Sequence, residues 1–163
     1  IVACIVSWFN QAKPQGPIVD AYCGIGTISL PLAAQGHRVT GLEINPDSIE
    51  QAGRNADANG LGPLTQFKAG DVADLLKDSL PGCSALVVDP PRRGLESSVI
   101  EVILSDPPPL LAYLSCDMAT QARDLKRLLQ PEGPYQLDQL QPVDFFPQTT
   151  HLENLALLRQ ISS

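Results

Sequence analysis

A cysteine and a glutamate in the second half of the sequence stand where side chains can carry out covalent catalysis. Cys116 directly follows an apolar run and precedes a segment with a helical pattern. The dipole at a helix N-terminus favours a thiolate, which is a nucleophile. Glu153 stands at the start of another apolar run. Burying a carboxylate there costs free energy unless it has a hydrogen-bonding partner or a catalytic role. The pair suggests a covalent intermediate and a carboxylate base; the alternatives are a small core cysteine and an exposed carboxylate on an edge strand.

A glycine-containing turn in the first part of the chain is a candidate ligand-binding loop. The stretch DAYCGIGT contains Gly24 and Gly26, which let the backbone approach a ligand closely. Ser29 stands where the dinucleotide fingerprint has its third glycine, which favours a nucleoside ligand without a pyrophosphate over NAD. S-adenosylmethionine fits this description. A tight turn without a ligand is the alternative for the two glycines taken alone.

Acidic residues stand at the ends of the first four expected strands: Asp20, Glu43, Asp71 and Asp89. A carboxylate at Glu43 can accept hydrogen bonds from both ribose hydroxyls of an adenosine, and Asp71 can accept one from the adenine amino group. Solvated strand ends are the alternative, but four acidic residues in equivalent places favour a binding site.

Asp89 opens a rigid turn, DPPRRG, that leaves the fourth strand. Amino-group methylases of adenine carry a similar Asp-Pro-Pro turn followed by an aromatic residue, whereas Arg92 follows here. The pair Arg92 and Arg93 is either a solvated surface or a contact for a phosphate. The turn itself is either part of a site or only a rigid strand exit.

The elements that must position these residues alternate between strand and helix. Strands are expected at 17–22, 38–44, 66–69, 85–88, 110–115, 135–143 and 152–160; helices are expected before Pro14, at 27–34 and 45–59, from Val72, and at 97–105 and 120–129. This order predicts an α/β, Rossmann-like fold with a mostly parallel seven-stranded sheet that ends in an antiparallel strand pair. Ligands of such sheets bind beyond the carboxyl ends of the strands, where the candidate residues stand.

Composition limits the function classes. The 163 residues suit one domain, and 11 Lys and Arg against 18 Asp and Glu give a net charge of −7, so general binding to nucleic acid is disfavoured. No run of 18 apolar residues exists, which excludes a membrane-spanning helix. The four cysteines are too far apart for a zinc or iron–sulfur site, so we expect no metal and a reducing, cytoplasmic compartment. We expect a monomer.

Five motifs, in order, resemble the catalytic domain of the RNA 5-methyluridine (uracil-C5) methyltransferases, and in motif detail they look closest to the 23S rRNA enzymes. They are DAYCGIGT, GLEINPDSIEQAGRNADANG, VVDPPRRG, LSCDMATQARDL and DFFPQTTHLENL. The resemblance implies a class I methyltransferase fold that uses S-adenosylmethionine. It implies Cys116 as the nucleophile and Glu153 as the general base. It also implies donor contacts at Tyr22, Thr27, Glu43, Asp71 and Asp89.

The implied reaction explains these residue types. C5 of uracil becomes nucleophilic after a thiolate adds at C6, and a base then removes the C5 proton. The uracil must leave its stack to be reached. The related 5-methylcytidine enzymes carry a cysteine in the turn after the fourth strand, where this chain has Pro91 or Arg92. Uracil is therefore the expected base.

Two departures from the family pattern stand out. Asp117 and Met118 replace the usual Asn-Pro after the nucleophile, which adds a negative charge beside the thiol and removes a rigid residue. The family's N-terminal RNA-binding domain and central segment lie outside residues 1–163, so we expect a catalytic-domain fragment, with a first helix that begins before Ile1. Its RNA, ribosomal before transfer RNA, would be bound mainly by the missing part. Alternative functions are methylation of another acceptor, a donor-binding module without catalysis and, third, a nicotinamide dehydrogenase.

Overall fold

A computed structural model describes residues 1–131, 133–143 and 152–161. Within these ranges the strands form one seven-stranded sheet in the order β3-β2-β1-β4-β5-β7-β6. The strands are β1 (Ile18–Ala21), β2 (Val39–Glu43), β3 (Thr65–Ala69), β4 (Ala85–Val88), β5 (Leu110–Ser115), β6 (Tyr135–Val143) and β7 (Glu153–Gln160). The pairs among β1 to β5 are parallel, while β7 runs antiparallel to both of its neighbours. The predicted fold class is confirmed.

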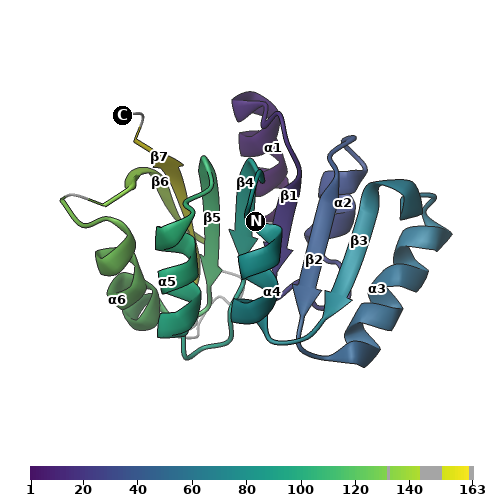
Figure 1. The fold of residues 1–163 in the computed structure, drawn as a ribbon. Helices are drawn as coiled ribbons and strands as arrows, with labels where there is room; N and C mark the ends of the chain where they lie inside the picture. Colours follow the sequence, from purple (N-terminus) through teal and green to yellow (C-terminus); the bar gives the residue numbers. More distant parts are fainter. Residues whose placement is uncertain (132, 144–151, 162–163) are drawn as a thin grey trace.

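Helices cover both faces of this sheet (Figure 1). They are α1 (Val2–Ala12), α2 (Ser29–Ala33), α3 (Pro46–Ala58), α4 (Val72–Ser79), α5 (Ser97–Ser105) and α6 (Met118–Leu128), with a short 3₁₀ helix at Gly62–Leu64. One apolar layer packs α4, α5 and α6 against the sheet, and a second packs α1 and α2 against the opposite face. Within the described ranges, none of the helices has the length and apolar character needed to cross a bilayer.

The central strands show why this sequence folds into a doubly covered sheet. All residues of β4 and β5 are buried, and successive residues alternate between the two layers: Leu111 and Tyr113 face α4–α6, while Ala112 and Leu114 face α1. Burial on both faces makes such strands continuous apolar runs. This is why the predicted ranges 85–88 and 110–115 match the observed strands.

Some predicted boundaries differ from the observed ones. The helix expected at 27–34 spans only Ser29–Ala33, and Pro31 is its third residue. The helix expected from Thr120 begins at Met118, because Asp117 caps it with its side chain. The Gly62–Leu64 turn was not predicted. His151 and the aromatic residues of the last motif lie outside the described residues.

Candidate active site

A cavity of about 320 Å³ lies at the carboxyl ends of β1, β2 and β4 and at the start of α4. Its polar walls include Tyr22, Glu43, Asp71, Asp89, Arg93 and Glu96. We call it the donor cavity. It contains four of the five side chains that the resemblance assigned to the donor.

Glu43 connects the donor cavity to the glycine turn. Its Oε2 accepts a hydrogen bond from the backbone N–H of Gly24 at 3.2 Å, and its Oε1 accepts one from Asn45 at 3.0 Å. Gly24 has a φ of +53° and Gly26 a φ of +91°. Glycine adopts such positive φ values without the steric strain that a Cβ would cause, so both positions favour glycine. Because each carboxylate oxygen has two acceptor positions, Glu43 keeps capacity for two further donors.

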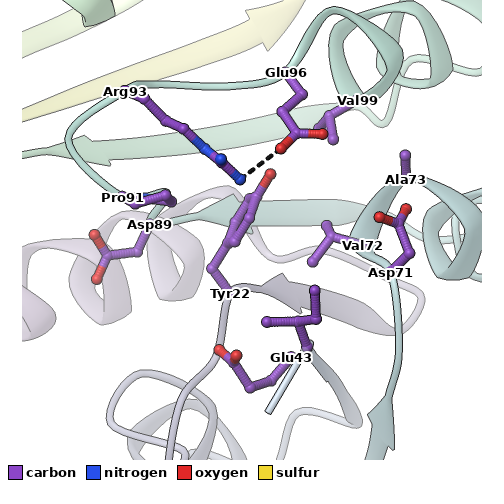
Figure 2. A pocket seen from close by; sticks show the side chains of 11 residues that line it. Tyr22, Glu43, Asp71, Val72, Ala73, Asp89, Pro91, Arg93, Glu96 and Val99 are labelled. Carbon is purple, nitrogen blue, oxygen red and sulfur yellow. Dashed lines mark hydrogen bonds and ion pairs between the residues drawn. The ribbon is translucent and has the colours of Figure 1, made fainter.

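Tyr22 stands in the middle of the donor cavity, in a left-handed backbone conformation with a φ of +66°. Figure 2 shows its ring between Asp89 and Asp71, with the hydroxyl directed towards the ion pair of Arg93 and Glu96. That ion pair joins Arg93 Nη2 to Glu96 Oε1 at 2.6 Å. Burial, with the nearby charge of Glu96, raises the pKa of Tyr22 to about 12, so its hydroxyl is a hydrogen-bond donor at neutral pH.

Asp71 lines the same cavity and caps α4. Its Oδ1 accepts a hydrogen bond from the backbone N–H of Asp74 at 3.1 Å. The cap fixes the carboxylate at the cavity wall, at the end of β3 where the sequence predicted it.

A second cavity of about 500 Å³ holds Cys116 and Glu153, and we call it the acceptor cavity. It is also lined by Thr27, Ile28, Asp89 and Leu114 and, at the start of the chain, by residues 1–3. Antiparallel pairing of β5 with β7 sets Ser115 opposite Asn154, so continuing this register by one residue sets Cys116 opposite Glu153. Since β7 lies between β5 and β6, the alternative of a carboxylate on an edge strand is wrong.

The structure separates the predicted donor contacts. Tyr22, Glu43, Asp71 and Asp89 line the donor cavity, whereas Thr27 lines the acceptor cavity that also holds Cys116. Gly24 contacts the donor cavity only indirectly, because its backbone N–H donates a hydrogen bond to Glu43, which lines it. Gly26 belongs to the same turn, and a Cβ there would lie 3.1 Å from Leu30 Cγ.

Asp89 is common to both cavities. Figure 2 shows its carboxylate pointing away from the Tyr22 ring. Burial, with the nearby charge of Glu153, raises the pKa of Asp89 to about 6. Asp20, at the end of β1, is 1% exposed, and its Oδ2 accepts a 2.5 Å hydrogen bond from Ser29 Oγ. Burial, together with the charge of Asp89, raises the pKa of Asp20 to about 7.

Comparison with known proteins identifies the family. Residues 3–161 match the family model described as tRNA (Uracil-5-)-methyltransferase. The chain belongs to this family. The resemblance found in the sequence is therefore confirmed, and a nicotinamide dehydrogenase has no support.

Relatives agree with the family assignment. A protein of Parasynechococcus marenigrum, described as an uncharacterized RNA methyltransferase, is 84% identical over 100% of this chain and 35% of its own length. A similarly described protein of Prochlorococcus marinus is 44% identical over 99% of this chain and 38% of its own length. The chain thus spans somewhat more than a third of these relatives.

A solved structure of a Pyrococcus abyssi enzyme has a similar fold. This tRNA (uracil-54, C5)-methyltransferase, in complex with S-adenosyl-L-homocysteine, is 30% identical and gives a TM-score of 0.81 over 96% of this chain and 38% of that one.

The family member described here differs from the usual pattern at Asp117, and its local structure shows the consequence. Asp117 Oδ1 accepts a hydrogen bond from the backbone N–H of Thr120 at 2.9 Å, and this bond lowers the pKa of the Asp117 carboxyl. Ser115 Oγ accepts a hydrogen bond from the Asp117 N–H at 3.1 Å. The segment around Cys116 is therefore held on both sides without the usual proline.

Sequence reasoning missed three buried polar residues around this segment: Gln121, Asp124 and Asn154. Asp124 Oδ2 accepts hydrogen bonds from the Tyr113 hydroxyl at 2.7 Å and from the Leu95 backbone N–H at 2.8 Å, which ties the DPPRRG loop to α6. A signal was present, because Gln121 and Asp124 fall on the same helical face as Leu125 and Leu128.

Proposed function

We propose that residues 1–163 are the catalytic domain of a longer enzyme that transfers a methyl group from S-adenosylmethionine to C5 of a uridine in RNA. The observation that carries the proposal is the placement of Cys116 and Glu153 in one cavity that shares Asp89 with a neighbouring nucleoside-sized cavity. A nucleophile and a base on one side, and ribose- and adenine-binding acceptors on the other, fit a two-substrate reaction.

The donor cavity fits S-adenosylmethionine. Glu43 has acceptor capacity for the ribose hydroxyls, and Asp71, which lines the same cavity, would accept from the adenine amino group. The turn at Gly24 and Gly26 lets the backbone approach the ligand, and Tyr22 supplies an aromatic face and a hydroxyl donor. When bound, this donor would supply an electrophilic methyl group.

The residues of the acceptor cavity perform the rest of the reaction. The Cys116 thiolate adds to C6 of uracil, and the electron pair of the 5,6 double bond moves to the enolate, which makes C5 nucleophilic. After C5 has gained the methyl group, Glu153 takes the C5 proton directly or through a water. The electrons of that C–H bond restore the double bond, and Cys116 leaves as a thiolate. A flipped or single-stranded uridine is required.

Two RNA classes are candidates for the acceptor. Motif detail favours ribosomal RNA, in particular 23S rRNA, and the similarity to the Pyrococcus abyssi tRNA methyltransferase favours transfer RNA as the second candidate. The net charge of −7 indicates that most affinity for either RNA comes from the remainder of the full-length protein.

The test uses the full-length protein, S-adenosylmethionine, and ribosomal and transfer RNA containing 5-fluorouridine. Fluorine at C5 does not leave as a proton does, so an adduct that resists denaturation is expected, and the RNA that forms it identifies the substrate. Cys116→Ala should abolish the adduct. Cys4→Ala, which removes another partly buried thiol outside both cavities, should retain it.

Absence of an adduct with both RNAs, together with measured donor binding, would contradict uracil-C5 chemistry. Methylation that survives Cys116→Ala would then indicate another acceptor, such as an amino group. Donor binding without any methylation would indicate a binding module that has lost catalysis.

A further inference from the structure

Two buried carboxamides join α6 to β7 next to the proposed nucleophile and base. Asn154 Nδ2 donates a hydrogen bond to Gln121 Oε1 at 2.5 Å, and Gln121 Nε2 donates to the backbone carbonyls of Asn154 at 3.1 Å and Tyr113 at 2.9 Å. Gln121 is 1% exposed and Asn154 is 6% exposed. A single side chain, Gln121, thus connects α6 with both β5 and β7.

The position of this pair relates it to catalysis. Asn154 directly follows Glu153, and Gln121 and Tyr113 flank Cys116 along the chain. Because side chains alternate along β7, Glu153 shares the face of Leu155, towards α1, while Asn154 shares the face of Ala156, towards α4–α6. The acceptor cavity lies on the α1 face, so the carboxamide pair holds the same strand ends from the opposite face.

Stability alone does not explain a polar pair at this place. Buried carboxamides are stabilising only when their hydrogen bonds are complete, and Asn154 Oδ1 lacks a protein partner among the described residues. Apolar side chains of similar size would remove the unpaired Asn154 Oδ1, although they would also remove the Gln121 donor to the Tyr113 and Asn154 carbonyls. Directional hydrogen bonds do, however, fix one relative position of two elements more narrowly than apolar packing does.

We propose that Gln121 and Asn154 are positioning residues that set the separation between the Cys116 sulfur and the Glu153 carboxylate. This inference rests on the proposed function of those two residues. Addition at C6 requires the thiolate and the ring, whereas removal of the C5 proton requires Glu153 at a fixed distance from a ring that Cys116 already holds. Loosening the pair therefore slows proton removal and elimination more than it slows addition.

The experiment replaces both carboxamides with apolar side chains of similar size, in the full-length protein with S-adenosylmethionine. The double variant Gln121→Met, Asn154→Leu avoids leaving one carboxamide unpaired. The control is Tyr135→Phe, which removes another buried hydrogen bond, from the Tyr135 hydroxyl to the Pro108 carbonyl at 3.0 Å, at the far end of β5 and β6.

Three quantities are measured for each protein: donor affinity by calorimetry, the rate of adduct formation with 5-fluorouridine RNA, and turnover of ordinary uridine RNA. For the double variant we expect donor affinity and the adduct rate within about threefold of the unchanged protein, and turnover lower by about 10- to 100-fold, the scale of an ångström-sized misplacement. A covalent adduct with ordinary RNA should accumulate during turnover. Tyr135→Phe should leave the ratio of adduct rate to turnover unchanged.

The other possible results contradict either the positioning role of the pair or the proposed function. If donor affinity, adduct rate and turnover fall together in the double variant, or if all three are unchanged, the pair has no positioning role. If the unchanged protein forms no adduct, the proposed function fails, and this inference fails with it.

Discussion

Asp89 and Glu153, at the end of β4 and the start of β7, line the same cavity, and the charge of Glu153 adds to burial in raising the pKa of Asp89 to about 6. Burial raises the pKa of Asp20 to about 7, and the charge of Asp89 contributes to this shift. Asp89 is thus close enough to feel the charge of Glu153 in the acceptor cavity and to influence the buried Asp20.

The protein should lose stability as pH rises through the titration of Asp20 and Asp89. Unfolded aspartates titrate near the ordinary value of 3.8, whereas the buried Asp20 keeps its proton in the folded protein up to about pH 7; Asp89, which is more exposed to solvent, contributes less. Between these values the folded state binds more protons, so the free energy of unfolding falls as pH increases from about 4 to 7. Denaturant unfolding at pH 5 and pH 8 measures this; equal values after correction for other groups would contradict it.

Asp20→Asn should remove the largest part of that dependence. The amide keeps an acceptor for Ser29 Oγ and carries no charge, so stabilisation of up to about 4 kcal/mol is expected at pH 8, from about 1.4 kcal/mol per unit of pKa shift. Little change is expected near pH 4. The exposed Asp78→Asn serves as the control and should behave as the unchanged protein. If the free energy of unfolding of Asp20→Asn differed from that of the unchanged protein by the same amount at pH 4 and at pH 8, Asp20 would not be held protonated in the folded state.

Glu43→Gln should weaken donor binding. Glu43 accepts backbone hydrogen bonds from Gly24 and Asn45, and in the proposed function it also accepts from the ribose. Hydrogen bonds to a charged acceptor are worth about 1.5–3 kcal/mol, so the affinity for S-adenosylmethionine should fall by about 10- to 100-fold in a calorimetric titration. Glu50→Gln, which removes a carboxylate from an exposed pair with Arg54, should not change the affinity. Unchanged binding in Glu43→Gln would place the donor elsewhere.

Glu153→Gln should separate addition from elimination. The amide does not accept the C5 proton, so the protein should form a covalent adduct with ordinary uridine RNA and fail to release it. Denaturing electrophoresis of the protein with labelled RNA detects the adduct. Glu101→Gln, on the exposed side of α5, should turn over normally. Normal turnover of Glu153→Gln would exclude Glu153 as the base.

The sequence predicted the elements and the edge of the sheet at which the site lies, because buried strands are apolar runs and their carboxyl ends carry the polar residues. It did not predict how the side chains divide between two cavities. Thr27 follows the glycine turn in sequence but lines the cavity of Cys116, since the turn from Tyr22 to Gly26 has left-handed residues that redirect the chain. The contact of Gln121 with Asn154 joins residues 33 positions apart, and nothing local in either motif indicates it.

Asp124 is the second buried carboxylate among the described residues. Its replacement should mainly lower the free energy of unfolding. Asp124→Ala leaves the Tyr113 hydroxyl and the Leu95 N–H without their acceptor and removes the partner of Arg123 Nε at 2.9 Å. Breaking such a buried charged network costs about 3–5 kcal/mol, whereas Tyr113→Phe, which removes one of its hydrogen bonds, should cost about 1 kcal/mol. Urea unfolding of both variants gives these values. Because Leu95 ends the loop that starts at Asp89, Asp124→Ala should also weaken donor binding at temperatures where it is folded, while Tyr113→Phe should not. Equal donor affinities would show that the loop holds its position without α6.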